Sequence, residues 1–562
     1  MSKPKPIPYG VSDYKIIVND GCVYVDKTMY IEILENAGYQ NLFLRPRRFG
    51  KSLFTSMLGY YYDINEKNNF DVLFSNTYIG KNPTKKKNTY YVMKFNFSGI
   101  RTDSDEIVLR GFTRSVHESL LTFCAVYNID IALEMDSPEE QLLSVFSHFQ
   151  RVSNDKIYVM IDEYDHFANE LLSSNVPLFK RSVSREGFVQ TWYEVLKKGA
   201  ETVVERIFIT GVSPITLDSL TSGFNTSLNR SMNVKFNEMA GFTDAEVETL
   251  IQETITEELP VDLMGMLTEY YNGYLFSKKG KERVFNSDMV LYYLDSYQQD
   301  HEPPDQLLDR NAVSDYGKLE KLITFQNPEQ NLEILKEIVF NGYTTAKLID
   351  SFTIGGEFEG EHFKSLLFYL GLLTIKETNL GTLRLQIPNA VMNGLYFEFL
   401  MKIVTKETDY IPDTKFIAEA MRELAYNNSC DLFVGLIEGL LHSFSNRDYR
   451  NFDEKYIKVA MAVYAGISNL YLIKSEYEVE EGYIDLIFFP RHPPASDLDI
   501  ILFELKYIKK KEVTTQRVDS ELSHAVEQLT RYKSAEEFKG KSLTCFAIVF
   551  AGDKCARLVK VG

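Results

Sequence analysis

A basic, glycine-containing loop follows an apolar segment near the N-terminus and precedes a segment with helical spacing. It lies between the apolar residues 41–44 and the helix-compatible residues 53–62. In such a strand–loop–helix unit, backbone N–H groups and a helix N-terminus bind phosphate, a lysine reaches the β- and γ-phosphates, and a hydroxyl ligates Mg²⁺. We therefore expect this loop to bind ATP, with Ser52 on the metal. The expected binding residues are Arg47, Arg48, Phe49, Gly50, Lys51 and Ser52.

The loop departs from the standard phosphate-binding pattern, because Arg45 stands where the first glycine is expected. A Gly-Lys-Ser tripeptide alone also fits an ordinary helix N-terminus, in which Ser52 lies near the cap and the arginines are solvated. The loop therefore needs a second site to support the nucleotide interpretation.

That second site is a pair of carboxylates at the end of the apolar residues 156–161. A buried carboxylate is costly unless it is paired or binds a metal, and Mg²⁺ would meet this need. Asp162 is expected to hold the metal directly or through water, and Glu163 to orient or deprotonate the attacking water. Thr210 ends the next apolar segment and could contact the γ-phosphate. Because ligands bind at the carboxyl ends of parallel strands, these ends should converge on one nucleotide site.

A second chemical cluster lies near the C-terminus, where residues 482–489 and 499–506 have the pattern of two strands of a hairpin. Glu504 and Lys506 share one face, and the neighbouring strand can bring Asp485 beside them. The two carboxylates are expected to bind Mg²⁺, or alternatively Mn²⁺, while Lys506 positions a water, which implies phosphodiester hydrolysis. A purely structural ion-pair cluster stays open as the alternative.

Three further features near this cluster leave alternatives open. The basic residues between Lys506 and Lys511, continuing to Arg517, could contact the backbone of DNA or RNA or could be a solvated loop. Glu454 and Glu476 are either outer carboxylates of the site or ordinary surface residues. These features define where a nucleic-acid partner would be sought.

Near the N-terminus, Asp26 and Lys27 either act near the nucleotide or form a surface ion pair, which is the favoured interpretation. Asp165 and His166 are expected to serve packing and hydrogen bonding. Arg206, Arg230 or Arg310 could act in trans as an arginine finger, and no local feature singles one out.

Several motifs together resemble the AAA-ATPase-like family, which pairs its ATPase domain with a C-terminal domain of the PD-(D/E)XK nuclease superfamily. The resemblance rests on residues 7–10, 25–28, 45–52, 161–165, 210–214, 222–225 and 271–274. It implies a P-loop ATPase fold in which Arg45 is a family feature. Asp485, Glu504 and Lys506 are similar to the D…ExK core of the superfamily, and Gln528, four residues before Tyr532, to its supporting helix.

The pattern of elements predicts an α/β protein. Residues 1–245 should form a P-loop NTPase domain with a parallel sheet and helices on both faces. Residues 246–410 should form a mostly helical lid or connector, and residues 411–562 a small α/β domain of the PD-(D/E)XK nuclease-like type.

Composition limits the function further. A chain of 562 residues favours several domains, and its formal charge of −18 argues that any contact with nucleic acid is local. The five scattered cysteines are expected to be reduced thiols, and the absence of a signal peptide or transmembrane segment predicts an intracellular protein without a membrane partner. Homo-oligomer formation is left open. The expected function is an ATP-dependent nuclease, with a nucleotide-gated switch that carries an inactive nuclease-like domain as the alternative.

Overall fold

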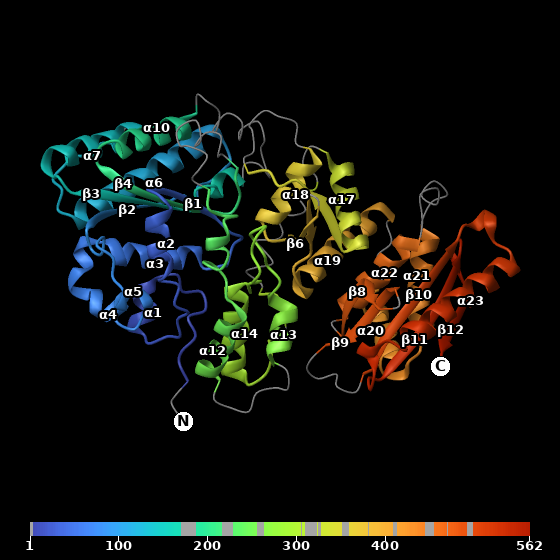
Figure 1. The fold of residues 1–562 in the computed structure, drawn as a ribbon. Coiled ribbons are helices and arrows are strands. Elements are labelled where there is room, and N and C mark those ends of the chain that lie inside the picture. Colours follow the sequence, from blue (N-terminus) through green and yellow to red (C-terminus); the bar gives the residue numbers. More distant parts are fainter. Residues whose placement is uncertain are drawn as a thin grey trace. The chain divides into compact units, whose positions relative to one another are not determined.

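The structure is a computed structural model in which the chain forms two compact units (Figure 1). It describes residues 4–135, 137–169, 187–215, 229–255, 263–304, 306–309, 323, 327–350, 359–379, 382–408, 413–443, 454–468, 470–480, 482–491 and 498–562. The first unit is Met1–Asn331 with Thr345–Asn389, and the second is Leu332–Thr344 with Ala390–Gly562. The domain boundaries 1–245, 246–410 and 411–562 stay predictions. Of the residues named from the sequence, 222–225 and Arg310 lie outside the described residues.

The first unit is built on a four-stranded parallel sheet with the strand order β1-β4-β3-β2. These strands are β1 (Gln40–Leu44), β2 (Tyr90–Asn96), β3 (Lys156–Asp162) and β4 (Val204–Gly211). Helices α6 (Asp105–Val126), α7 (Pro138–Val152) and α10 (Phe188–Ala200) cover one face, and α3 (Lys51–Tyr62) packs on the other (Figure 1). Because both faces are covered, the inner strands β3 and β4 contain continuous apolar runs, at residues 157–161 and 207–209. The predicted α/β architecture is confirmed.

A short segment after the sheet lies along the outer edge of β1. Asn229 forms a parallel bridge with Leu42, and the Arg230 N–H donates to the Leu42 carbonyl at 2.8 Å. The Leu44 N–H donates to the Ser231 hydroxyl at 2.7 Å. The backbone of β1 is therefore hydrogen-bonded on both sides.

The remainder of the first unit is mostly helical, as predicted for the middle of the chain. Its other α-helices among the described residues are α1 (Tyr14–Asn19), α2 (Tyr30–Ala37), α4 (Phe70–Phe74), α5 (Tyr78–Lys81), α12 (Asp244–Thr254), α13 (Leu263–Tyr271), α14 (Ser287–Asp300) and α18 (Gly360–Tyr369). Helix α12 begins with a capping box between Thr243 and Glu246, which satisfies backbone N–H groups at its first turn. An antiparallel hairpin of β6 (Thr374–Asn379) and β7 (Thr382–Gln386) follows α18.

The second unit contains a five-stranded mixed sheet in the order β12-β11-β10-β9-β8. Its strands are β8 (Tyr471–Val479), β9 (Gly482–Pro490), β10 (Ile500–Ile508), β11 (Leu543–Ala551) and β12 (Lys554–Val561). The pair β10 and β11 is parallel and the other pairs are antiparallel. The predicted hairpin of β9 and β10 is confirmed.

Alternating side chains of β10 pack toward opposite faces of this sheet. Leu502 lies in one apolar core with Leu529 of α23 (Thr515–Tyr532), whereas Phe503 contacts Phe433 of α21 (Asp431–Ser443). Both faces are therefore covered by helices. The remaining elements that involve residues of this unit are α17 (Pro328–Asn341), β5 (Tyr343–Ala346), α19 (Ala390–Thr408), α20 (Thr414–Asn427) and α22 (Glu454–Ile467).

The described residues contain no helix that combines the length and the apolar character needed to cross a membrane. The five cysteines are all free thiols.

Candidate functional site

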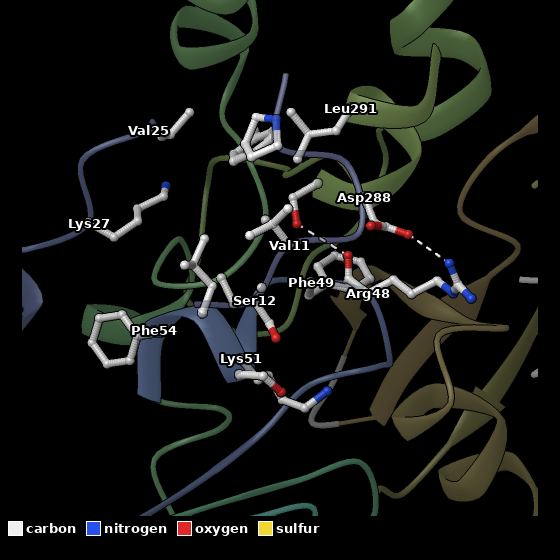
Figure 2. Close-up of a pocket in the computed structure, with 18 of the residues that line it drawn as sticks. Val11, Ser12, Val25, Lys27, Arg48, Phe49, Lys51, Phe54, Asp288 and Leu291 are labelled. Carbon is white, nitrogen blue, oxygen red and sulfur yellow. Dashed lines mark hydrogen bonds and ion pairs between the residues drawn. The ribbon is translucent and has the colours of Figure 1, made fainter. Parts of the chain in front are cut away.

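A cavity of about 460 Å³ lies over the loop between β1 and α3 in the first unit (Figure 2). Its walls come from four parts of this unit: residues 47–54, the N-terminal residues 8–25 with Lys27, residues 239–242, and the first turns of α14. Glu163, His166 and Leu250 complete the lining. A cavity of this size is typical of small-molecule and cofactor sites.

The loop turns sharply at Gly50, which caps the N-terminus of α3 with φ 85°. This left-handed conformation favours glycine because a side chain would strain it. Helix α3 has 12 residues and begins at this loop. Its first N–H groups and the positive end of its dipole therefore lie beside the cavity. Ser52, in the first turn, lines the cavity. This backbone arrangement suits an anion.

Lys51 is buried and its ammonium group donates to the Pro46 carbonyl at 2.9 Å. Burial lowers the pKa of Lys51, while the nearby charges of Asp162 and Glu163 oppose that shift. Among the residues that the structure describes, no carboxylate forms an ion pair with this ammonium group. Lys51 is therefore held by a neutral acceptor that phosphate oxygens could replace.

The two carboxylates after β3 have different surroundings. Thr210 donates its hydroxyl to Asp162 from the adjacent strand β4, and neither residue lines the cavity. Glu163 does line it, and its Oε2 lies 3.0 Å from His166 Nδ1. The hydrogen bond with His166 lowers the pKa of Glu163 to about 2 although burial opposes this. The strand ends thus meet as predicted, with Thr210 bonded to Asp162.

Arg48 and Phe49 are held mainly by protein contacts. The Arg48 guanidinium pairs with Asp288 at 2.7 Å, drawn in Figure 2, and with Asp309 at 2.9 Å. The Phe49 ring packs edge-on against Tyr274 at a centroid distance of 4.9 Å. For these two residues, nucleotide binding through the backbone stays a prediction. Sequence reasoning missed both acidic partners of Arg48, because they lie far along the chain.

Arg47 directs its guanidinium toward His166, with 3.1 Å between Nη2 and Nδ1. It lines the cavity together with Glu163, so these three side chains form one polar wall. The prediction that Arg47 binds nucleotide is consistent with this position.

Arg45, the residue in place of the first glycine, is 1% exposed and is a structural element of the loop. It donates to the carbonyls of Ser231 and Phe236, each at 2.7 Å. Its guanidinium lies 4.4 Å from the ring centroid of Phe43 and 4.1 Å from that of Phe276. Burial lowers the pKa of Arg45 to about 9. The arginine therefore fixes the loop from the side away from the cavity.

The favoured interpretation of Asp26 and Lys27 as a surface ion pair is wrong. Lys27 is buried and pairs with Glu246 at 2.7 Å, and Asp26 accepts from the Thr28 and Tyr78 N–H groups at 2.9 and 2.6 Å. Docking of α12 brings Glu246 to the ammonium group, which local sequence could not indicate.

Three other residues named from the sequence form hydrogen bonds within the first unit. Asp165 accepts from the Ser213 N–H at 2.7 Å, which is the expected hydrogen-bonding role. Arg206 donates to the Gly38 carbonyl at 3.3 Å, and Arg230 to Asn41 Oδ1 at 3.0 Å. These contacts do not single out an arginine finger.

In the second unit, the strands β9 and β10 bring Asp485, Glu504 and Lys506 together. Asp485 Oδ2 accepts from the Leu505 N–H at 2.8 Å, so its side chain reaches across to β10. Lys506 Nζ lies 2.8 Å from Glu504 Oε1. The juxtaposition expected from the strand register is therefore present.

Glu504 has the most unusual environment of this cluster. Its side chain is 1% exposed, and its Oε2 has no hydrogen-bond partner among the described residues. Burial first, and the charge of Asp485 second, raise the pKa of Glu504 well above its ordinary value. A buried carboxylate oxygen without a partner, beside a second carboxylate, fits a divalent cation. Within the described part of the chain, no three or more acidic, histidine or cysteine side chains form a ready metal-binding group.

Sequence reasoning missed Lys458 of α22, which is the centre of this carboxylate cluster. Its Nζ lies 2.5 Å from Asp485 Oδ1, 2.6 Å from Glu476 Oε1 and 3.5 Å from Glu454 Oε1. Glu454 and Glu476, for which the sequence left open a role as outer carboxylates or as surface residues, contact the site through this lysine. The spacing of Glu454 and Lys458 on one helix was the feature of the sequence that could have indicated this lysine.

Gln528 on α23 donates to the Tyr532 hydroxyl at 3.4 Å. Its predicted supporting role stays a prediction, because within the described residues no hydrogen bond joins it to the three core residues. The basic residues 509–511 are exposed just beyond β10. Arg517 pairs with Glu512 at 2.8 Å, and Lys510 with Asp553 at 3.5 Å.

Comparisons with known proteins match the two parts of the chain that carry these candidate sites. The family model of predicted AAA-ATPases matches residues 8–221, and that of the PD-(D/E)XK nuclease superfamily matches residues 452–560. An uncharacterized protein from the vnfD 5′ region of Azotobacter chroococcum mcd 1 is 26% identical over 293 residues, which are 51% of this chain and 52% of that protein. The chain thus spans about half the length of this curated relative.

Among solved structures, Cdc6p from Pyrobaculum aerophilum is similar at 12% identity and a TM-score of 0.25, covering 68% of this chain and 93% of that one. A superposition that loose bears on neither the fold nor the function. The family matches show that residues 8–221 are similar to predicted AAA-ATPases and that residues 452–560 are similar to the PD-(D/E)XK nuclease superfamily.

Proposed function

We propose that this protein binds and hydrolyses ATP in its first unit and thereby controls a metal-dependent cleavage of phosphodiester bonds in DNA or RNA by its second unit. The observation that carries the proposal is Glu504. Its buried Oε2 has no hydrogen-bond partner among the described residues, and Asp485 and Lys506 lie beside it. That combination is costly for folding and useful for binding a cation.

In the first unit, the backbone at Gly50 and the start of α3 would hold the phosphates of ATP. Lys51 would exchange the Pro46 carbonyl for phosphate oxygens, which are stronger acceptors. Mg²⁺ bound with ATP would neutralise charge on the phosphates, and Ser52 and Asp162 are the residues to hold it. Glu163 stays ionised because its pKa is lowered, so it can orient the attacking water.

In the second unit, Asp485 and Glu504 would hold a divalent metal that polarises the scissile phosphate. Lys506 would position the attacking water beside Glu504 and stabilise developing negative charge. The exposed basic residues 509–511 follow the same strand and would contact the nucleic-acid backbone. Gln528 would support this site from α23.

The test measures phosphate release from ATP and cleavage of mixed DNA and RNA with Mg²⁺ or Mn²⁺. Lys51→Ala should lower phosphate release by roughly a hundredfold or more and suppress ATP-dependent cleavage. Glu504→Ala should abolish cleavage and leave phosphate release intact. The exposed Glu527→Ala on α23 is the matched control and should resemble the wild type. Cleavage that survives Glu504→Ala would rule out the nuclease assignment.

A second candidate is a nucleotide-gated interaction protein with an inactive nuclease-like domain. The observation in its favour is that Asp485 is already paired with Lys458 at 2.5 Å. Phosphate release from ATP without cleavage of any nucleic acid in the same assay would favour this candidate.

A further inference from the structure

Lys458 lies at the point where the carboxylates of the second unit converge. Its side chain is 8% exposed, and it reaches Asp485 and Glu476 at 2.5 and 2.6 Å. The ammonium group is therefore a resident cation of the cluster.

This lysine engages the oxygen of Asp485 that the backbone leaves available. Asp485 Oδ2 accepts from the Leu505 N–H, and Oδ1 contacts Lys458. Glu504, the other expected metal ligand, has its Oε1 on Lys506 and its Oε2 without a partner among the described residues. One ligand is thus occupied by a cation and the other has an oxygen ready to bind one.

The charges around Lys458 and Lys506 do not balance. The carboxylates of Glu454, Glu476, Asp485 and Glu504 face these two ammonium groups. When all the carboxylates are ionised, two negative charges remain, which one divalent cation would neutralise. The cluster therefore attracts a metal while Lys458 occupies part of its position.

We propose that Lys458 is a competing internal cation that must leave Asp485 before a divalent metal binds there. Glu476 and Glu454 hold the ammonium group after it leaves, so the lysine shifts within the cluster and stays paired. Lys458 is a positioning residue that sets the metal affinity of the site. This inference rests on the proposed metal site formed by Asp485 and Glu504.

The experiment is calorimetric titration of the full-length, nucleotide-free protein with Mn²⁺ at fixed pH. Lys458→Met should tighten Mn²⁺ binding by roughly tenfold or more, because it removes a positive charge a few ångströms from the metal. Lys458→Gln should tighten binding less, since its amide can still donate to Asp485. Glu504→Gln should abolish Mn²⁺ binding at this site, so it identifies the part of the titration signal that comes from the site.

A matched control is Lys364→Met, which removes another largely buried lysine ion pair, the one with Glu361 at 3.0 Å in the first unit. It should bind Mn²⁺ as the wild type does. If Lys458→Met does not fold, Lys458→Gln decides the question, because its amide keeps a hydrogen bond to the carboxylates.

The outcomes separate the two proposals. Binding that depends on Glu504 and that both Lys458 variants leave unchanged or weaken overturns this inference and leaves the metal site standing. If Mn²⁺ binds only to the Lys458 variants, the result supports the inference about Lys458 in its strongest form. The absence of Glu504-dependent binding in every variant overturns both proposals.

Discussion

Lys51 in the cavity of the first unit and the two lysines in the carboxylate cluster of the second unit have opposite kinds of partner. Lys51 donates to a backbone carbonyl, and its charged neighbours Asp162 and Glu163 are bonded to other partners. Lys458 and Lys506 instead donate directly to carboxylates. A lysine is therefore kept apart from carboxylates at position 51 and is paired with them at positions 458 and 506.

The two sites also differ in the volume of the cavity beside their lysines. The cavity at Lys51 measures about 460 Å³, whereas the one beside Lys458 and Glu476 measures about 10 Å³. A site whose charges are kept apart by an open cavity can accept a large anion such as ATP. A site whose carboxylates are already paired with lysines must rearrange to accept a cation, which makes its own lysine part of the binding equilibrium.

The strongest test of this comparison removes one lysine from each site without ligands. Lys458→Met should cost about 3–5 kcal/mol in the second unit, because it leaves buried carboxylates unpaired. Lys51→Met should cost less, about 1–2 kcal/mol, since it breaks one hydrogen bond to a carbonyl and no ion pair. Hydrogen exchange measured by mass spectrometry resolves the two units, through peptides of β9 and β10 and of β1 and α3. Equal losses of protection at the two sites would contradict the comparison.

Arg45 offers the next largest effect. Arg45→Gly restores the standard pattern of a phosphate-binding loop, yet we expect it to destabilise the first unit by about 3 kcal/mol, because the carbonyls of Ser231 and Phe236 lose their donors. Urea unfolding measures this change. Arg101→Gly, at a residue whose side chain is 76% exposed, is the control and should cost far less. A stable Arg45→Gly protein with ordinary ATP binding would refute the structural role.

Gly50 provides a smaller and more local test of the loop. Gly50→Ala should destabilise the protein by about 1–2 kcal/mol, because its φ of 85° is left-handed, and Gly50→Asn should cost less. Calorimetric unfolding with and without ATP measures both effects. Gly394→Ala in α19, where an added Cβ meets no atom within 4 Å, should instead be neutral or stabilising. Equal losses for Ala and Asn at position 50 would show that backbone strain is not the cause.

The smallest expected effect is a pH dependence at Glu163. Its pKa is lowered from 4.5 to about 2 in the folded protein, so its stabilising contribution is complete above about pH 4.5 and is lost as the pH falls toward 2. The stability difference between wild type and Glu163→Gln should therefore be constant near neutral pH and shrink below 4.5. Urea unfolding from pH 7 to 3 measures it, with the exposed Glu106→Gln as control. A stability difference between wild type and Glu163→Gln that grows as the pH falls would contradict a lowered pKa of Glu163.

Residue patterns predicted those parts of the molecule that depend on local order. Apolar runs marked β1, β3 and β4, and the rule that parallel strands end at one edge placed Thr210 and Asp162 together. The period of a strand likewise placed Glu504 and Lys506 on one face.

The partners that come from distant helices could not be predicted in this way. Lys458 reaches Asp485 only because α22 docks beside β8 and β9, and Glu246 reaches Lys27 only because α12 docks beside the N-terminal segment. Such pairs depend on how helices pack. The local sequence pattern does not show which residues of a helix will contact which neighbouring element. The helical spacing of Glu454 and Lys458 showed that they could pair with each other, and left open what else they would contact.

The segment of residues 229–231 along β1 has a consequence for the behaviour of the protein in concentrated solution. A strand at the border of a sheet offers unpaired N–H and C=O groups, which another chain can use to extend the sheet. Here Asn229, Arg230 and Ser231 take up the hydrogen-bonding groups of Leu42 and Leu44. The strand that leads into the loop of residues 45–52 is thereby protected from sheet-to-sheet association and aggregation at that border.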